Sequence, residues 1–325
     1  MPNEEAQSLT LAPRQQLLAQ QCVPKIVAAE GTTASWAWDE YFSGRIRNPN
    51  TRKAYLHAVS KFLAWCEQEG NALQQVSPGM IGRYLDQHVG SAPTRKQHMS
   101  AIRGLFDTLV ERHVLILNPA HSVRTERFSV TEGKTPLITT EQARMLLKSM
   151  PTETAIDLRD RAIISMLIYT AARVGAISRL KVQDVADDGE QMVFFFHEKG
   201  GKQRQIPARI DLRRTVRSYT SLLPHTEAAA PLFRTAQGRT GLLTLAPMSP
   251  VDICRMVKRR VKAADLPANI SPHSFRSCTA TDLLEHGVSI EDVQYLLGHS
   301  DPRVTRLYDR RQRQITRNIV ERISV

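Results

Sequence analysis

Residues 271–276 read SPHSFR, a pattern that predicts the first turn of a helix. Ser271 suits the N-cap, and Pro272 suits the next position, where a helix needs no backbone N–H. His273 and Arg276 then lie three residues apart on one face of that helix. Because helix N-termini attract anions, a cationic His–Arg pair there predicts an anion-binding site.

Toward the C-terminus, residues 295–301 read YLLGHSD. Gly298 is expected to end a short helix that begins after Ser289, so that His299 follows directly on its C-terminus. Tyr308 comes nine residues after His299, in a segment that is too basic to be expected in a core.

Upstream, residues 170–176 read TAARVGA and follow an apolar helix expected over residues 157–169. The small residues around Arg173 leave room for a bulky anion, whose oxygens the guanidinium group can bind in pairs. Residues 198–204 read EKGGKQR and are expected to form the turn of a hairpin. Lys199 would lie on that turn, where it can reach into a groove.

Each of these sites also has a purely structural explanation. An arginine at a helix end can cap backbone carbonyls, as Arg173 would do. A lysine on a turn, such as Lys199, is usually solvated, and a lone tyrosine in the position of Tyr308 usually packs on the surface.

Taken together, the four sites supply the groups needed for metal-independent phosphoryl transfer to a tyrosine. Fixed arginines, helped by histidines, would meet the charge that develops on the phosphate. A lysine would give a proton to the leaving 5′-hydroxyl, and a phenol would be the nucleophile. No paired acidic metal ligands are evident, so no metal or other cofactor is expected. The six candidate catalytic residues are Arg173, Lys199, His273, Arg276, His299 and Tyr308.

These motifs resemble those of the tyrosine recombinase (phage integrase) family. Its T-G-L-R-[IV]-S-E box compares with TAARVGA, its G-K-G-x-K-x-R hairpin with EKGGKQR, and its H-x-[LF]-R-H-[ST]-x-A box with HSFRSCTA at residues 273–280. Its L-G-H motif, followed nine residues later by tyrosine, compares with residues 297–299 and Tyr308. Ala176 and Ser277 depart from the usual glutamate and histidine, which affects local packing more than the central chemistry.

The resemblance implies a mainly helical fold with a small β-sheet: a helical core-binding (SAM-like) domain followed by an α+β catalytic domain. It implies a site-specific recombinase that cuts and rejoins double-stranded DNA through a 3′-phosphotyrosyl intermediate, without metal or ATP. The protein would be a monomer when free in solution, and four protomers would assemble on two DNA sites. Accessory DNA-bending proteins are possible partners. The alternatives are a type IB topoisomerase-like enzyme that relaxes DNA and a non-catalytic DNA-binding regulator.

The composition fits such a protein. The 325 residues, 42% of them hydrophobic, suggest two domains with real cores. The net charge of +12 points to a polyanionic partner. The longest apolar run, residues 162–172, is too short to cross a bilayer, no secretory signal is evident, and the four cysteines form no C-x-x-C pair. We therefore expect a cytoplasmic protein with reduced thiols and no membrane partner. The resemblance implies a bacterial or phage-derived protein that associates with the nucleoid.

The domain organisation follows from the local patterns. We expect a flexible glutamine-rich tail, a helical DNA-binding domain, a polar linker, and a catalytic domain with a C-terminal tail, over residues 1–30, 31–125, 126–136 and 137–325 respectively. Within the tail, residues 310–325 could form an amphipathic helix that docks on a neighbouring protomer. Basic residues near helix starts in the first domain are candidate DNA contacts, although a solvated surface is the favoured explanation for each one taken alone: Arg52, Lys53, Arg95, Lys96 and Arg103.

Overall fold

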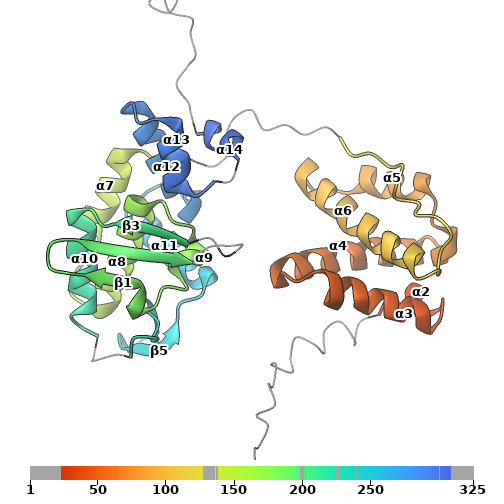
Figure 1. Ribbon diagram of the computed structural model, residues 1–325, viewed down its shortest axis with the longest axis horizontal. Helices are drawn as coiled ribbons and strands as arrows, with labels where there is room; N and C mark the ends of the chain where they lie inside the picture. The colour runs from red at the N-terminus through yellow and green to blue at the C-terminus, as the bar shows by residue number, and fades with distance from the viewer. Residues whose placement is uncertain are drawn as a thin grey trace, which may run out of the picture. The chain divides into compact units, whose positions relative to one another are not determined.

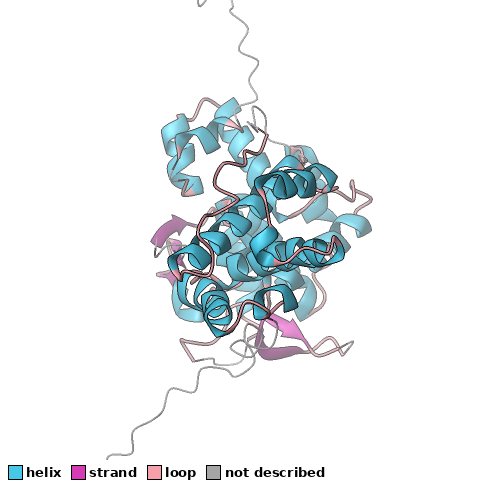
Figure 2. Ribbon diagram, turned by 90° about the vertical axis from the view of Figure 1, so that its right-hand side faces the viewer, coloured by secondary structure: helices cyan, strands magenta, loops and turns pink. Residues whose placement is uncertain are grey.

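The computed structural model describes residues 23–126, 136, 138–197, 201, 203–223, 227–238, 240–299 and 301–308. The chain forms two compact units that divide between Ser129 and Val130, and each is described by itself (Figure 1). Helices dominate the described residues and strands are few (Figure 2), which confirms the expected fold class. The division falls within residues 126–136, the expected linker, most of which lies outside the described residues.

The first unit is a small helical bundle. Its longest helices pack against each other and enclose fully buried aromatic side chains, among them Trp38, Phe62 and Phe106. The two phenylalanine rings meet edge to face, with 6.3 Å between their centroids. The helices of this unit are α2 (Lys25–Ala28), α3 (Thr32–Asp39), α4 (Pro49–Gln68), α5 (Pro78–Gln87) and α6 (Ala92–Glu111), with a π-helical turn η1 (Glu40–Arg45) and a 3-10 turn η2 (Leu73–Gln75).

The prediction of a flexible tail over residues 1–30 is wrong for residues 25–28, which form helix α2. Residues 1–22 lie outside the described residues, but α2 packs into the bundle, with Ile26 5% and Val27 0% exposed. The backbone N–H of Ile26 also donates to a carboxylate oxygen of Glu67, at 2.9 Å. Burial of these two adjacent apolar side chains offsets part of the chain entropy that the segment loses.

Helix starts in this unit follow their capping chemistry. The Ser77 hydroxyl accepts from the Met80 N–H at 3.3 Å and begins α5, as its sequence predicts. Helix α4 begins after Asn48, whose side chain caps it, and Pro49 occupies its first turn. Helix α6 begins after Ser91.

The second unit carries the strands. Its first sheet has the order β1-β2-β3, all antiparallel, and its second pairs β4 with β5. The strands are β1 (Val185–Asp187), β2 (Met192–His197), β3 (Gln203–Pro207), β4 (Arg234–Ala236) and β5 (Leu243–Pro247). The hairpin expected from the sequence is therefore confirmed as β2 and β3. Met192, Phe194 and Phe196 alternate into the core along β2.

Helices surround these sheets and build most of the core. They are α7 (Thr140–Ser149), α8 (Ala155–Thr170), α9 (Val174–Ile177), α10 (Ile210–Thr220), α11 (Pro250–Ala263), α12 (Pro272–Glu285), α13 (Ile290–Leu297) and α14 (Pro302–Arg306), with a 3-10 turn η3 (Val182–Asp184). Helix α7 has a side-chain cap, because the Thr139 hydroxyl accepts from the Gln142 N–H at 3.1 Å. Helix α8 lies at the centre and contacts α7, α9, α10, α11 and α12.

A buried ion-pair cluster ties α8 to α11. Asp160 is fully buried, and its two carboxylate oxygens accept from Arg159, Arg259 and Arg260 at 2.7–3.1 Å. A buried carboxylate requires such partners, since removing them would leave an uncompensated charge. The cluster thereby fixes the N-terminal half of α8 against α11. Among the described helices, none is long and apolar enough to cross a membrane.

Candidate active site

The N-terminal turn of α12 holds Arg276 at the centre of a buried hydrogen-bond network. Ser271 and Pro272 occupy the N-cap and the first turn, as the sequence predicts. The Arg276 side chain is 2% exposed. Its guanidinium group donates to two backbone carbonyl oxygens, that of Ala171 at 2.6 Å and that of Leu297 at 2.5 Å. These bonds fix the guanidinium plane between the ends of α8 and α13.

The end of α8 places Arg173 beside this network. Ala171 adopts a left-handed conformation with φ 48° and ends the helix. Two residues later, Arg173 occupies the N-cap of α9, where its side chain is exposed. Its positive charge helps to lower the pKa values of both His273 and His299. The structure therefore brings the two predicted arginines to one site.

The ring of His299 is held at both nitrogens. Gly298 ends α13 in a left-handed conformation with φ 63°, as its sequence predicts. His299 Nε2 lies 2.8 Å from Arg276 Nη2, and His299 Nδ1 lies 2.9 Å from the Thr305 hydroxyl oxygen. Because the guanidinium group can only donate, Nε2 accepts and the proton of the neutral ring resides on Nδ1. Desolvation first, then the charges of Arg276 and Arg173, lowers the pKa of His299 to about 4.

Tyr308 lies directly against His299. The two rings are nearly parallel, with 5.8 Å between their centroids and 10° between their planes. The phenolic oxygen is 3.4 Å from His273 Nε2, and the Thr281 hydroxyl donates to the Tyr308 carbonyl at 3.2 Å. The structure thus joins the predicted tyrosine to both predicted histidines.

Two expectations about these residues are wrong. Tyr308 is only 7% exposed, and it packs with a small apolar cluster of the residues Ala171, Ala280, Leu284, Val293 and Leu297. The short helix α14 turns this ring inward while its basic side chains stay exposed. The pair His273–Arg276 is also not doubly cationic, because desolvation and the charges of Arg276 and Arg173 lower the pKa of His273.

Lys199 lies outside the described residues, in the sequence between β2 and β3. Two residues that sequence reasoning did not select also belong to this site. Arg204 on β3 contributes to lowering the pKa of His299. Thr305, fully buried, orients the His299 ring. The hairpin motif already contains the arginine, whereas a threonine three residues before the tyrosine gives no recognisable signal.

The candidate DNA contacts of the first unit fall into two groups. Arg52 donates to the Ile46 carbonyl, Arg95 to the Gly90 carbonyl and to Glu126, and Arg103 to the carbonyls of Ala120 and Val123. These three arginines therefore hold loops of their own unit in place. Lys53 on α4 and Lys96 on α6 are exposed.

The arrangement can bind an anionic ester and attack it. A phenol, a neutral imidazole that can accept its proton, a buried guanidinium and a second arginine meet at the N-terminus of a helix. Among the described residues, no group of three or more His, Cys, Asp or Glu side chains is arranged to hold a metal ion.

Comparison with known proteins matches this site and fold to one family. Residues 136–314 match the model of the phage integrase family, and residues 37–113 match its N-terminal SAM-like domain. The chain is 29% identical over 276 residues to tyrosine recombinase XerD of Ralstonia nicotianae, covering 83% of this chain and 86% of the relative. It is 30% identical over 277 residues to tyrosine recombinase XerC of Pseudomonas fluorescens, covering 82% and 87%.

A solved structure shares the fold. The XerH site-specific recombinase bound to its difH substrate superposes with a TM-score of 0.65 at 17% identity, covering 95% of this chain and 92% of that one. The chain therefore belongs to the phage integrase family of tyrosine recombinases, enzymes that cleave and rejoin DNA.

Proposed function

We propose that this site-specific DNA recombinase cuts duplex DNA with Tyr308 as nucleophile, through a 3′-phosphotyrosyl intermediate and without a metal ion or ATP. The observation that carries the proposal is the position of the phenol. Its oxygen lies 3.4 Å from His273 Nε2, and its ring is stacked beside His299, which Arg276 contacts. A phenol becomes a strong nucleophile when a neighbouring base accepts its proton.

The charge of the DNA phosphate sets the protonation of this site. Arg173 and Arg276 bind the non-bridging oxygens, aided by the N-terminus of α12. Both histidines are neutral in the DNA-free protein, because their pKa values lie below the ordinary value. An anion bound between them raises these pKa values, since it favours the imidazolium form. His273 can then accept the phenolic proton as the Tyr308 oxygen attacks phosphorus.

The leaving group needs a proton on the opposite side of the phosphate. The bond from the Tyr308 oxygen to phosphorus forms as the bond to the 5′-oxygen breaks, and that oxygen takes a proton from Lys199. One phosphodiester replaces another of similar energy, so the step requires no ATP and is reversed by attack of a 5′-hydroxyl.

Strand exchange between two duplexes involves four strands, and each cut strand needs its own nucleophile. We therefore propose that monomers assemble into a tetramer on two DNA sites, and that accessory proteins bend the DNA. This assembly would form in the cytoplasm, on the nucleoid. Residues 310–325, outside the described residues, would link neighbouring protomers. Deleting residues 312–325 should then spare binding to a single site and impair pairing of two sites.

A covalent trap tests the nucleophile. The protein is incubated with DNA fragments from beside its own gene, the reaction is stopped with detergent, and protein–DNA adducts are sought on a denaturing gel. We expect an adduct that Tyr308→Phe abolishes, while Tyr295→Phe, a change at an exposed tyrosine on α13, leaves it intact. Sequencing the trapped junctions would give the target site. An adduct that persists in Tyr308→Phe would overturn the assignment.

Two further measurements separate this function from its alternatives. Cleavage should continue in the presence of EDTA, because no step requires a metal ion. A plasmid with two sites should give recombinant products; relaxation of a single-site plasmid without recombinants would indicate a topoisomerase. Sequence-specific binding without any adduct would indicate a regulator.

A further inference from the structure

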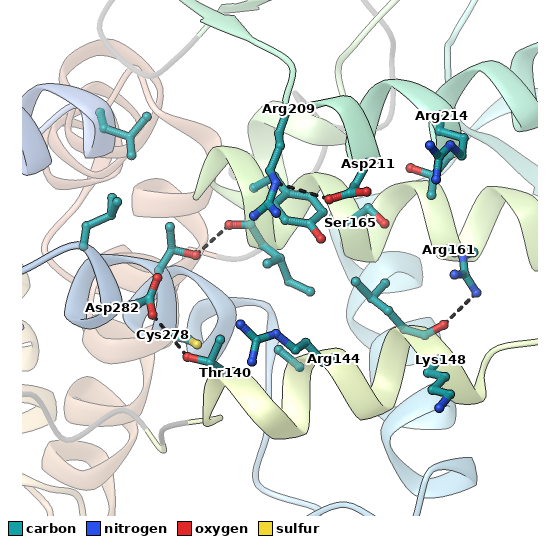
Figure 3. A pocket seen from close by; sticks show the side chains of 18 of the residues that line it. Thr140, Arg144, Lys148, Arg161, Ser165, Arg209, Asp211, Arg214, Cys278 and Asp282 are labelled. Atoms are coloured by element: carbon teal, nitrogen blue, oxygen red, sulfur yellow. Dashed lines mark hydrogen bonds and ion pairs between the residues drawn. The ribbon is translucent and has the colours of Figure 1, made fainter. Parts of the chain in front are cut away.

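A pocket of about 810 Å³ opens on the second unit, among α7, α8, α10 and α12, with one residue from α13 (Figure 3). It is distinct from the site of Tyr308. Arg161 and Ser165, which line it, lie on α8 about two turns or more before Arg173. Cys278, Asp282 and His286 line it from a face of α12 different from the one that carries His273 and Arg276.

Positive charge dominates the lining. Five cationic side chains contribute to it, from α7, α8 and the start of α10: Arg144, Lys148, Arg161, Arg209 and Arg214. The two acidic ones are already engaged: Asp211 pairs with Arg209 at 3.2 Å, and Asp282 lies 3.3 Å from the Thr140 hydroxyl and 3.5 Å from His286.

Three of the cations are not neutralised. Among the described residues, no carboxylate forms an ion pair with Lys148, Arg161 or Arg214. Arg161 is held in place by two hydrogen bonds from Nη1, to the carbonyls of Leu147 and Met150 at 2.6 and 3.3 Å. A guanidinium group fixed in this way loses little side-chain entropy when it binds an anion.

A buried hydroxyl in the same pocket has no partner. The Ser165 side chain is 1% exposed and lines the pocket, and its oxygen makes no hydrogen bond within the described residues. Serines in helices usually bond to the carbonyl one turn earlier, and buried polar atoms are nearly always paired. The lining of the pocket therefore includes an unsatisfied polar group.

Apolar side chains complete the lining, and they favour an amphipathic occupant. Leu147, Ile168, Leu283 and Leu296 are partly buried and face the pocket. The lining residues lie on helices or directly next to one, so no strand edge is offered for pairing with an extended peptide. A segment that satisfies its own backbone hydrogen bonds, namely a helix, fits such a groove.

We propose that this pocket is a docking site for an acidic amphipathic helix of a partner protein. Its apolar stripe would pack on the four aliphatic side chains named above, and its carboxylates would pair with Lys148, Arg161 and Arg214. The chain's own residues 310–325 match the pocket poorly in charge, because they contain five arginines and one glutamate. The proposal does not depend on the reaction at Tyr308.

Peptide binding to the full-length, DNA-free protein tests the proposal. The probe is a fluorescein-labelled helical peptide with leucines at i, i+3, i+4 and i+7 and glutamates elsewhere, and the readout is fluorescence anisotropy. We expect the double variant Lys148→Glu/Arg214→Glu to raise the Kd at least about tenfold. The matched control is Arg255→Glu/Lys258→Glu, the same charge change on exposed residues of α11 outside the pocket, and it should raise the Kd far less.

A third variant probes the unsatisfied hydroxyl. Ser165→Leu fills the pocket without changing its charge, and it should weaken peptide binding while circular dichroism shows a folded protein. If that variant fails to fold, the Lys148/Arg214 pair, both exposed, still decides the question. Equal weakening by the pocket pair and the α11 pair would overturn the proposal.

Competition separates the other possible occupants. A peptide of residues 309–325 that displaces the acidic probe more effectively than an unlabelled copy of the probe would assign the pocket to the chain's own C-terminal segment and overturn the proposal. A selective loss of duplex DNA affinity in the pocket pair, relative to the α11 pair, would make the pocket part of the DNA interface and overturn it too. Displacement by the unlabelled acidic probe alone would support it.

Discussion

Arg276 donates through Nη1 to the carbonyl oxygen of Ala171 at 2.6 Å, across 105 positions of sequence. Ala171 ends α8 with φ 48°, a conformation that costs a residue with a Cβ roughly 1–2 kcal/mol. This turn directs the carbonyl toward the buried guanidinium group and places Arg173 on the same side. The strained backbone therefore positions both arginines of the proposed active site.

Substitutions at Ala171 should reveal that strain. Ala171→Gly removes the Cβ and should leave the free energy of unfolding unchanged or raise it by up to about 1 kcal/mol. Ala171→Val should lower it by at least about 2 kcal/mol, because a β-branched side chain tolerates a positive φ poorly and the site is fully buried. Denaturant unfolding followed by circular dichroism measures both. A glycine variant that is less stable than alanine by more than 1 kcal/mol would contradict a strained turn.

Thr305 should act as a positioning residue for His299. Thr305→Val keeps the shape of this buried side chain but removes the acceptor for the Nδ1 proton. We expect the loss of this hydrogen bond to raise the activation free energy of cleavage by about 1 kcal/mol. The cleavage rate should then be about fivefold lower, with little change in DNA affinity. Nitrogen NMR of the imidazole should show that the variant keeps the Nδ1–H tautomer, because Arg276 still donates to Nε2, while the Nδ1–H proton has lost its acceptor. Thr305→Ser should restore the rate, an outcome that a purely packing role does not give.

Local chemistry allowed the sequence to predict much of this framework. The caps at Ser77, Thr139 and Ser271 depend on side chains within three residues, and each appears where its pattern predicts it. The hairpin β2–β3 shows a clear two-residue alternation. Strands β4 and β5 were not predicted, because they are only 3 and 5 residues long and carry little periodic signal.

The state of the site depends on contacts that no local pattern encodes. Tyr308 is buried because α14 turns it onto residues of α12 and α13. His299 is neutral because Arg276, itself fixed by Ala171 and Leu297, donates to it. The identity of the groups could thus be read from sequence, whereas burial and protonation arise from packing between distant segments.

The first unit should lose stability in mild acid through His98. Burial first, then the charges of His88, Lys61 and His57, lowers the pKa of His98 from 6.5 to about 4, and its Nδ1 lies 2.9 Å from the Tyr84 hydroxyl. The unfolded chain therefore binds more protons between these two values, so stability is full above pH 6.5 and falls as the pH drops toward 4.

Tryptophan fluorescence isolates this effect, because all three tryptophans, at positions 36, 38 and 65, lie in the first unit. His98→Gln should flatten the pH dependence of the denaturant midpoint in that window. His121→Gln, at an exposed position, should leave it steep. An unchanged slope in His98→Gln would mean that other groups cause the loss; the pKa of His88 is also lowered, chiefly by burial.

Two basic residues of the first unit should respond differently to truncation. Lys53 is exposed on α4. If its side chain contacts phosphate, Lys53→Ala should make the negative slope of log affinity against log salt concentration less steep, by about 1. Arg103 donates to the carbonyls of Ala120 and Val123, so Arg103→Ala should mainly lower the unfolding free energy, by about 1–3 kcal/mol. Filter binding at several salt concentrations, with tryptophan-monitored unfolding, separates the two effects. An unchanged salt slope for Lys53→Ala would remove this lysine from the interface.

Lys199 is the one proposed catalytic group whose role follows from sequence alone, and leaving-group chemistry can test it. Lys199→Ala should slow cleavage of ordinary DNA by about 10²–10⁴-fold, the usual contribution of a general acid. Replacing the 5′-bridging oxygen of the scissile phosphate with sulfur gives a leaving thiol with a pKa near ~8.5, which departs without protonation. The variant should then cleave this DNA nearly as fast as the unaltered protein, whereas Tyr308→Phe should stay inactive on both substrates because it lacks the nucleophile. An equal defect of Lys199→Ala on both substrates would place the proton donor elsewhere, and Lys202, three residues later in the sequence, would be the next residue to replace.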